Sequence, residues 1–255
     1  MRVTVLGKSP SWQDAGGACS GYLIEEDDHA LLLDCGNGVF GKLRAVRDYV
    51  DIHAVVLSHL HADHFLDLVP YAYALAYAPR QQTDTPARPV LHAPPGAPAT
   101  FRRVTGAWGS EDLIEKAFDL REYSAGDEPA VGPLRLRFGR VDHFVEAFAV
   151  EVTSAAGAGR FVFGADTGPS ESLVEFARGA DLLLVEATLP CPEPEGPRGH
   201  LTPAEAGEHA RRAGVARLVL THISDELDEA WARDEAAASF GGDVEVAREG
   251  AVYDV

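Results

Sequence analysis

The sequence predicts an α/β fold in which two β-sheets pack face to face and helices cover their outer sides. Two observations support this prediction. Short apolar segments typical of strands come in runs with helical segments between them, and this arrangement occurs in two comparable halves of the chain. No linker separates the halves, so we expect a single domain over residues 1–255.

The first half contains apolar segments separated by turns and by a glycine-rich loop at 11–20. Strands are expected at 2–7, 21–26, 30–36 and 53–58, and helices at 39–50 and 65–78. Residues 79–100 are rich in proline and indicate a loop around one short strand, 89–94. A helical segment is expected at about 98–119.

The second half again begins with strands. Strands are expected at 134–141, 148–154, 159–166, 181–188, 216–224, 243–248 and 251–255, and helices at 170–180, 202–215 and 225–239. The helix at 202–215 has clear end signals, since Thr202 can cap it, Pro203 suits its first position and Gly214 suits its end.

The composition limits the classes of partner and compartment. The formal net charge is −18, which argues against general affinity for nucleic-acid backbone or anionic membrane. A small phosphate-bearing substrate stays possible because a bound metal can dominate the charge of its own site. Three widely spaced cysteines, no apolar leader segment and no apolar run of membrane-spanning length together predict a soluble cytoplasmic protein.

Four metal-ligating residue types lie within six positions of "LSHLHADHFLDL". His59, His61, Asp63 and His64 directly follow an apolar strand, which can hold the loop after it rigidly. Imidazole and carboxylate are ligands that suit zinc, manganese or iron. Four ligands in six residues are too many for one ordinary site, so the pattern predicts two metal ions and needs further ligands from elsewhere.

Three later strands each end in one such residue. His143 follows "LRLRFGRVD", Asp166 ends "FVFGAD", and His222 ends "RLVLTH". One histidine at a strand end is more often structural than a ligand, but the six-residue cluster needs partners and these are well placed. His29, His53, His92 and His209 lack this context, and we interpret them as structural or solvent-facing.

The order of these motifs resembles that of the metallo-β-lactamase superfamily, whose fold is a four-layer αββα sandwich. The similarity is greater still to the ribonuclease Z branch. "GADTGPSESLVEFARGADLLLVEATL" and "GHLTPAEAGEHARRAGVARLVLTHIS" resemble that branch over nearly all of residues 161–224, and "LLLDCGNG" near Asp34 resembles its first motif.

The resemblance implies a ligand for each position of a two-zinc centre. His59, His61 and His143 would bind one ion, Asp63, His64 and His222 the other, and Asp166 would bridge both. Such a centre would activate a shared water, which Asp63 could also orient. Manganese or iron could replace zinc at these ligands.

The resemblance also gives His200, in "GHLT", a catalytic role. It would be the proton donor or phosphate contact, supported by Glu186 of "VEAT". A carboxylate on one imidazole nitrogen fixes the tautomer and favours the charged ring. The structural alternative is a capping or loop histidine.

One feature of the ribonuclease Z enzymes that process transfer RNA is missing. They carry a long protruding arm that grips RNA, whereas residues 148–166 form only a compact pair of strands with a short Gly/Ala turn. This predicts a metal-dependent phosphodiesterase of the short-form kind that acts on a small phosphodiester or nucleotide, with long RNA an unexpected partner. Relatives commonly form homodimers.

Three other functions stay open from the sequence alone. The same centre could hydrolyse carboxylic esters, lactones or thioesters, or the protein could process transfer RNA without the usual arm. A non-catalytic member that keeps the fold for binding would be expected to have lost ligands, and here every ligand is present.

The helical segment 98–119 contains residues that could line a substrate mouth. Arg102 and Arg103 could contact phosphate and Trp108 could stack on a base. We favour the structural interpretation, in which Phe101 and Trp108 belong to the core and the arginines face solvent.

Overall fold

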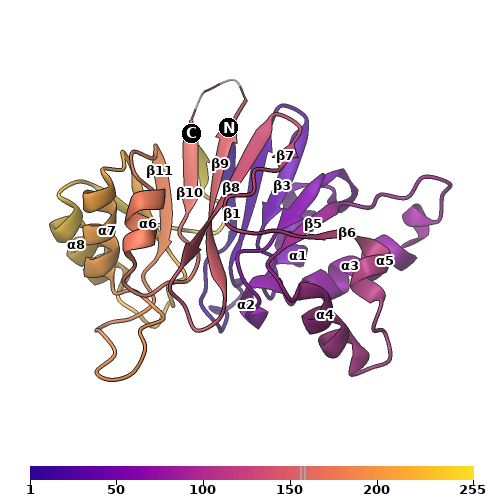
Figure 1. Cartoon of the computed structure of the whole chain (residues 1–255), viewed down its shortest axis with the longest axis horizontal. Coiled ribbons are helices and arrows are strands. Elements are labelled where there is room, and N and C mark those ends of the chain that lie inside the picture. The colour runs from indigo at the N-terminus through magenta and orange to yellow at the C-terminus, as the bar shows by residue number, and fades with distance from the viewer. Residues whose placement is uncertain (156, 158) are drawn as a thin grey trace.

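The structure is a computed structural model that describes residues 1–155, 157 and 159–255. Figure 1 shows two β-sheets in the middle of the molecule with helices against the outer side of each. The predicted four-layer αββα sandwich of two mixed sheets is confirmed. Both chain termini lie near the upper edge of this view, and the short helix α2 (Ala62–Phe65) lies at the lower edge.

The first sheet comes mainly from the N-terminal half and has the strand order β14-β1-β2-β3-β4-β5-β6. These strands are β1 (Arg2–Gly7), β2 (Gly21–Glu26), β3 (His29–Leu33), β4 (Ala54–Val56), β5 (Val90–Ala93), β6 (Asp119–Glu122) and β14 (Val252–Asp254). Strands β3 to β6 are parallel, whereas β14 pairs antiparallel with β1. The end of the chain therefore completes the sheet built by its beginning.

The second sheet has the strand order β13-β12-β11-β10-β9-β8-β7. Its strands are β7 (Ala130–Val131), β8 (Leu134–Val141), β9 (Ala147–Ser154), β10 (Arg160–Phe163), β11 (Leu182–Glu186), β12 (Leu218–Thr221) and β13 (Val244–Val246). Strands β10 to β13 are parallel, which brings the carboxyl ends of β10, β11 and β12 to one edge. The Gly/Ala turn predicted between β9 and β10 lies partly outside the described residues.

The helices form the two outer layers (Figure 1). One layer contains α1 (Val39–Val46), α3 (Leu68–Tyr77), α4 (Ala97–Gly106) and α5 (Leu113–Ala117), and the other contains α6 (Glu171–Phe176), α7 (Pro203–Ala213) and α8 (Glu229–Phe240). Short 3-10 turns occupy Tyr49–Asp51 and Pro79–Gln81. None of the helices in the described part of the chain combines the length and apolar character that a membrane span needs.

The central strands β2, β3 and β4 of the first sheet are buried on both faces, which explains why they are largely apolar. Along β3, Leu31 and Leu33 face the core between the two sheets, while Leu32 faces the core beneath the helices. Neighbouring strand β2 alternates in the same way, with Ile24 toward the other sheet and Leu23 toward the helices. This double burial holds the strand ends, and the loops that follow them, in fixed positions.

The prediction of a single helix at about 98–119 is wrong. Instead α4 and α5 are separated by a turn in which Gly109 has a φ of 79°, and residues 119–122 form β6. Phe101 is buried as expected, but Trp108 lies in this turn with 48% of its surface exposed and donates its indole N–H to the Tyr73 hydroxyl. Glycine reaches this left-handed conformation without steric cost, and that breaks the helix.

The helix expected at 65–78 is confirmed with a later start, at Leu68. Pro70 is its third residue. A proline is tolerated there because the first N–H groups of a helix have no intrahelical partner. The preceding residues form the separate helical turn α2, which places Asp63 and His64 on one short rigid segment.

An ion-pair cluster joins β8, β9 and β10. Glu151 is 8% exposed and accepts from Arg137 at 3.0 and 2.8 Å and from Nε of Arg160. We expect Glu151→Gln to lower the free energy of unfolding at neutral pH by about 1–2 kcal/mol, because it leaves charged donors poorly paired. The value lies at the low end of the usual range since Arg137 is 39% exposed and solvent screens it. Urea unfolding measures this difference.

The same cluster predicts a pH dependence. Burial opposes ionisation of Glu151, but hydrogen bonds from Arg137 and Arg160 lower its pKa below the ordinary 4.5. Its contribution is therefore present above pH 4.5 and is lost as the pH falls through the lowered folded-state value. The stability gap between wild type and Glu151→Gln should shrink in acid, whereas the control Glu235→Gln, at an exposed position of α8, should show little gap at any pH. A gap that is constant with pH would contradict this assignment.

Candidate metal centre

Strand ends deliver the candidate residues to the lower edge of the molecule in Figure 1, between the two sheets. His59 and His61 follow β4, and Asp63 and His64 lie in α2. The remaining five follow or end strands of the second sheet, or precede a helix: His143 after β8, Asp166 after β10, Glu186 at the end of β11, His222 after β12, and His200 just before α7. The structure brings all of the residues that the sequence singled out into one region.

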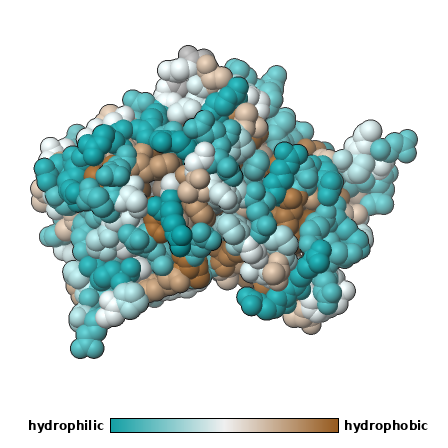
Figure 2. All heavy atoms as spheres, viewed as in Figure 1, coloured by the Kyte–Doolittle hydropathy of each residue, from teal (hydrophilic) through white to brown (hydrophobic). Residues whose placement is uncertain are grey.

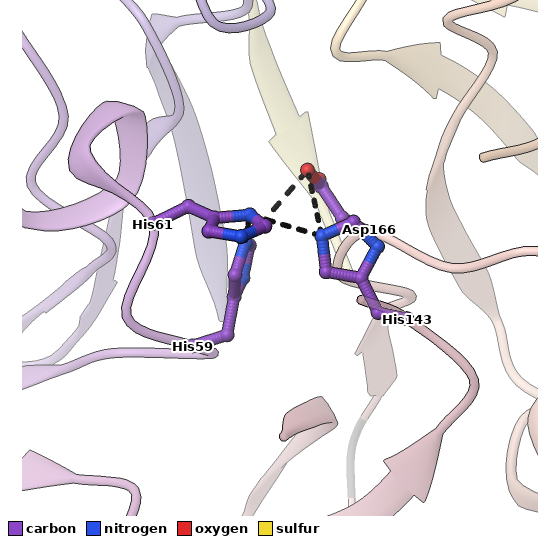
Figure 3. Close-up of side chains that lie close together, drawn as sticks. All are labelled: His59, His61, His143 and Asp166. Atoms are coloured by element: carbon purple, nitrogen blue, oxygen red, sulfur yellow. Dashed lines mark hydrogen bonds and ion pairs between the residues drawn. The ribbon is translucent and has the colours of Figure 1, made fainter. Parts of the chain in front are cut away.

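His59, His61, His143 and Asp166 form the first donor group, and Figure 3 shows their side chains pointing toward one another, with His59 and His61 on the same loop. Nδ1 of His61 lies 3.2 Å from Nε2 of His59 and 3.0 Å from Nε2 of His143. Oδ2 of Asp166 lies 3.8 Å from Nε2 of His59 and 4.0 Å from Nε2 of His143. Four donor atoms thus surround one point.

Asp63, His64, His222 and again Asp166 form the second donor group. Nε2 of His222 lies 3.1 Å from Oδ2 of Asp63 and 3.3 Å from Oδ2 of Asp166. Nε2 of His64 lies 3.5 Å from Oδ2 of Asp63 and 3.3 Å from Oδ2 of Asp166. Oδ2 of Asp166 therefore borders both groups.

Hydrogen bonding alone does not satisfy these atoms. His143 donates from Nδ1 to the Gly199 carbonyl at 2.7 Å, which leaves a lone pair on the Nε2 that faces His61. Nε2 of His64 and Oδ1 of Asp166 are buried without any hydrogen-bond partner. Two donors on one tetrahedral zinc ion lie about 3.3 Å apart, close to the spacings observed here. The donor set therefore fits divalent metal binding.

The protonation states favour metal binding as well. Burial lowers the pKa of His59 well below its ordinary value and lowers that of His143 to about 4. Burial opposes ionisation of Asp166, but the surrounding imidazoles, His222 first, hold the pKa of that carboxyl well below its usual range. Neutral imidazoles and ionised carboxylates are the forms that bind metals, and these are the forms favoured at His59, His143 and Asp166. Burial lowers the pKa of His64, but the Asp166 and Asp34 carboxylates more than offset this and raise it well above its ordinary value, so His64 must lose a proton before its Nε2 can bind a metal.

Burial also shows from which side the region is accessible. The side chains of His59, His64, His143, Asp166 and His222 are buried, whereas His61 and His200 are half-buried. The half-buried histidines mark the open side, which lies toward the loop between β8 and β9.

Three residues beside the donor groups have left-handed backbone conformations that non-glycine residues seldom adopt. The φ angles are 57° at Asp34, 56° at Ala165 and 50° at His222. Each position follows a strand and turns the chain sharply at the point where a side chain must face the donor groups. Local strain of this kind occurs where surrounding structure enforces it, often at functional sites.

Asp34 orients His64 without belonging to either donor group. Its Oδ2 accepts from Nδ1 of His64 at 2.7 Å and from the Ser58 hydroxyl at 2.8 Å, and its Oδ1 accepts from the Ser58 N–H at 2.7 Å. The bond to Nδ1 directs the lone pair of His64 to Nε2. The sequence placed Asp34 in a recognisable motif but showed no role for it, because that role depends on β3 and β4 lying side by side.

We expect Asp34→Asn to weaken zinc binding by about 10–100-fold, the usual effect of losing the partner of a metal-binding histidine. Asparagine keeps the shape and tolerates positive φ, but its amide cannot accept from both His64 and the Ser58 N–H. Zinc titration with a competing chelator measures the loss. An unchanged zinc affinity would show that Asp34 does not orient His64 for metal binding. The control is Asp27→Asn, because Asp27 also has positive φ but is exposed.

Glu186 and His200 form a hydrogen-bonded pair next to the donor groups. Nδ1 of His200 lies 2.8 Å from Oε1 of Glu186, and Glu186 also accepts from the N–H groups of Thr167 and Leu201 and from the Thr188 hydroxyl. These bonds occupy the carboxylate, which favours an acid–base pair over a third metal site. Burial lowers the pKa of His200, but the hydrogen bond and charge of Glu186 more than offset this and raise it to about 9.

The other histidines lie outside both donor groups, as predicted. Nε2 of His209 accepts from the N–H of Ser170, and Nδ1 of His53 accepts from the N–H of Ala30. Arg102 is exposed and pairs with Glu115, and Arg103 is exposed too, which agrees with the solvent-facing interpretation of both.

Comparison with known proteins gives consistent matches. Residues 6–223 match the family described as a beta-lactamase superfamily domain. The chain is 35% identical over 257 residues to the uncharacterized protein ML1173 of Mycobacterium leprae, covering all of this chain and 89% of that protein. It is 30% identical to the probable metallo-hydrolase YhfI of Bacillus subtilis over the whole of both chains. The crystal structure of YhfI has a TM-score of 0.84 over 99% of both chains, at 28% identity. Ribonuclease Z of Haloferax volcanii is 27% identical, covering all of this chain and 95% of that one.

Proposed function

The chain belongs to the metallo-β-lactamase superfamily and is a metal-dependent hydrolase, and we propose that it is a phosphodiesterase for small phosphodiester or nucleotide substrates. The observation that carries the proposal is the Glu186–His200 pair at 2.8 Å beside two adjoining donor groups. Hydrolysis of a carboxylic ester or lactone in this superfamily does not need that pair.

We assign two zinc ions to the centre, one in each donor group, with manganese or iron as chemically similar substitutes. His59, His61 and His143 would hold the first ion and Asp63, His64 and His222 the second. The position of Asp166 Oδ2 between the groups supports a bridging role. When bound, such an ion pair supplies Lewis acidity and lowers the pKa of a water molecule toward neutrality.

His200 would protonate the leaving alcohol. Glu186 occupies its Nδ1, which leaves Nε2 as the donor. The His200 ring lies nearly parallel to that of His222, a proposed ligand, with ring centres 5.7 Å apart. Asp63, on the same side as His222, can also accept a proton from the attacking water or orient it.

Small substrates are favoured over long RNA for two reasons. The net charge of −18 repels a polyanion outside the immediate centre, and β9 ends at Ser154 while β10 begins at Arg160, which leaves no room for a long arm there. Similarity to ribonuclease Z supports phosphodiester chemistry, so cleavage of a transfer RNA precursor is the second candidate.

A substrate panel tests the proposal. Zinc- or manganese-loaded protein is assayed against bis(p-nitrophenyl) phosphate, p-nitrophenyl phosphate, p-nitrophenyl acetate and a lactone. We expect the diester to be hydrolysed with the highest kcat/KM. Turnover of the acetate or lactone with none of the diester would contradict the proposal and assign the centre to carbonyl substrates.

A further inference from the structure

An exposed phenylalanine lies at the open side of the metal centre. Phe144 directly follows His143 in the loop between β8 and β9, and 54% of its surface is exposed. The next residue, Val145, is apolar and 38% exposed. Single exposed apolar residues are common on proteins, but here two exposed apolar residues directly follow a buried donor histidine.

One side of the Phe144 ring packs against the main chain at Gly199. A side chain at position 199 would collide with the ring, so Phe144 packs directly over the backbone of Gly199. The carbonyl of Gly199 in turn accepts from Nδ1 of His143. The ring therefore has a fixed position relative to the first donor group, and its exposed surface faces away from that backbone.

The ring also borders the proposed proton donor. Its centre lies 5.9 Å from that of His200, at an interplanar angle of 68°, and 5.2 Å from that of His143. An exposed aromatic ring therefore adjoins the proposed proton donor. Figure 2 shows that apolar residues (brown) gather at the indented lower edge of the molecule, near the position of α2 in Figure 1.

We propose that Phe144 is the platform of a leaving-group subsite and stacks against an aromatic base on the departing alcohol. This inference rests on the proposed function and narrows the substrate class to diesters whose leaving alcohol is a nucleoside. Stacking of a base on an aromatic side chain is sequence-tolerant, so the subsite selects nucleosides over alkyl or sugar alcohols without selecting one base.

Two matched substrates isolate the contribution of the base. One is a dinucleoside monophosphate, and the other is its stable abasic analogue that lacks the base on one sugar; product analysis shows which alcohol departs. Wild-type protein should cleave the bond to a base-bearing alcohol with a kcat/KM about 5- to 150-fold higher than the bond to the abasic alcohol, the range typical of one stacked base. Most of this difference should appear in KM.

Phe144→Ala should reduce that preference severalfold or more, and Phe144→Trp should keep it. Tyr77→Ala removes an equally exposed aromatic ring at the end of α3 and should keep the wild-type preference. Zinc content and thermal unfolding of each variant show whether the fold and the metal centre are intact.

The possible results distinguish failure of the Phe144 subsite from failure of the proposed phosphodiesterase function. Diester turnover with an unchanged preference in Phe144→Ala would overturn the subsite and leave the proposed function standing, as would a wild type with no preference for the base. If metal-loaded wild type cleaves neither substrate, nor the chromogenic diester, the proposed function fails and the subsite fails with it.

Discussion

Asp166→Ala should lose hydrolytic activity by more than about 100-fold and should bind fewer zinc ions than wild type. The reason is geometric, since Oδ2 of Asp166 lies within 4.0 Å of the Nε2 atoms of His59, His64, His143 and His222. Loss of a residue that only hydrogen-bonds to a metal ligand usually lowers metal affinity or activity 10–100-fold, so loss of an atom shared by both donor groups should lower them more. Bound zinc per chain and kcat/KM for a diester are the two measurements.

Asp142→Asn provides the matched control. Asp142 is an exposed acid beside His143, and its backbone carbonyl, not its side chain, makes the local hydrogen bonds. This variant should keep both zinc and activity. If Asp166→Ala retains the wild-type zinc content and activity, the carboxylate does not bridge two ions, and the arrangement proposed for the centre is wrong.

His200→Ala should reduce kcat for a diester with an alkoxide leaving group by about 10²–10⁴-fold, the usual contribution of a positioned general acid. The loss should be much smaller for bis(p-nitrophenyl) phosphate, because p-nitrophenolate leaves readily without a proton. Zinc content should not change, since Nε2 of His200 belongs to neither of the two donor groups that we assign to zinc. The ratio of the two losses distinguishes proton donation from a general structural effect.

Glu186→Gln tests the contribution of the Glu186 carboxylate while leaving the His200 imidazole in place. The amide keeps the size of the side chain but removes the negative charge that holds the proton on His200. It should show the same dependence on the leaving group, to a smaller extent. Equal losses with both leaving groups in His200→Ala would contradict the general-acid role and would favour a phosphate contact.

The fold and donor groups could be predicted because each depends on a local signal. Strands buried on both faces appear as apolar runs, and the carboxyl ends of such strands are rigid places for ligands. Asp166 and His222 were each found at the end of an apolar run, and His143 after a strand that alternates apolar and polar residues. Parallel pairing of β10 with β11 and of β11 with β12 brings the strand ends that carry Asp166 and His222 to the same edge of the sheet.

What could not be predicted depends on long-range packing. The role of Asp34 follows from the pairing of β3 with β4, which aligns Leu33 with Val56 and brings Ser58 and His64 within reach of the carboxylate. Trp108 was expected in the core, yet the turn at Gly109 directs the chain away and leaves the indole exposed. Phe144 has an ordinary sequence context, and only the fold shows that it lies over Gly199 and beside His200.

Zinc titration of the metal-free protein, with diester hydrolysis recorded at each step, tests whether the protein is a phosphodiesterase with two zinc ions. We expect two zinc ions to bind per chain and diester turnover to develop as these sites fill. A chain that binds a single ion at saturation, or one that binds two ions and hydrolyses acyl esters but no diester, would contradict this expectation.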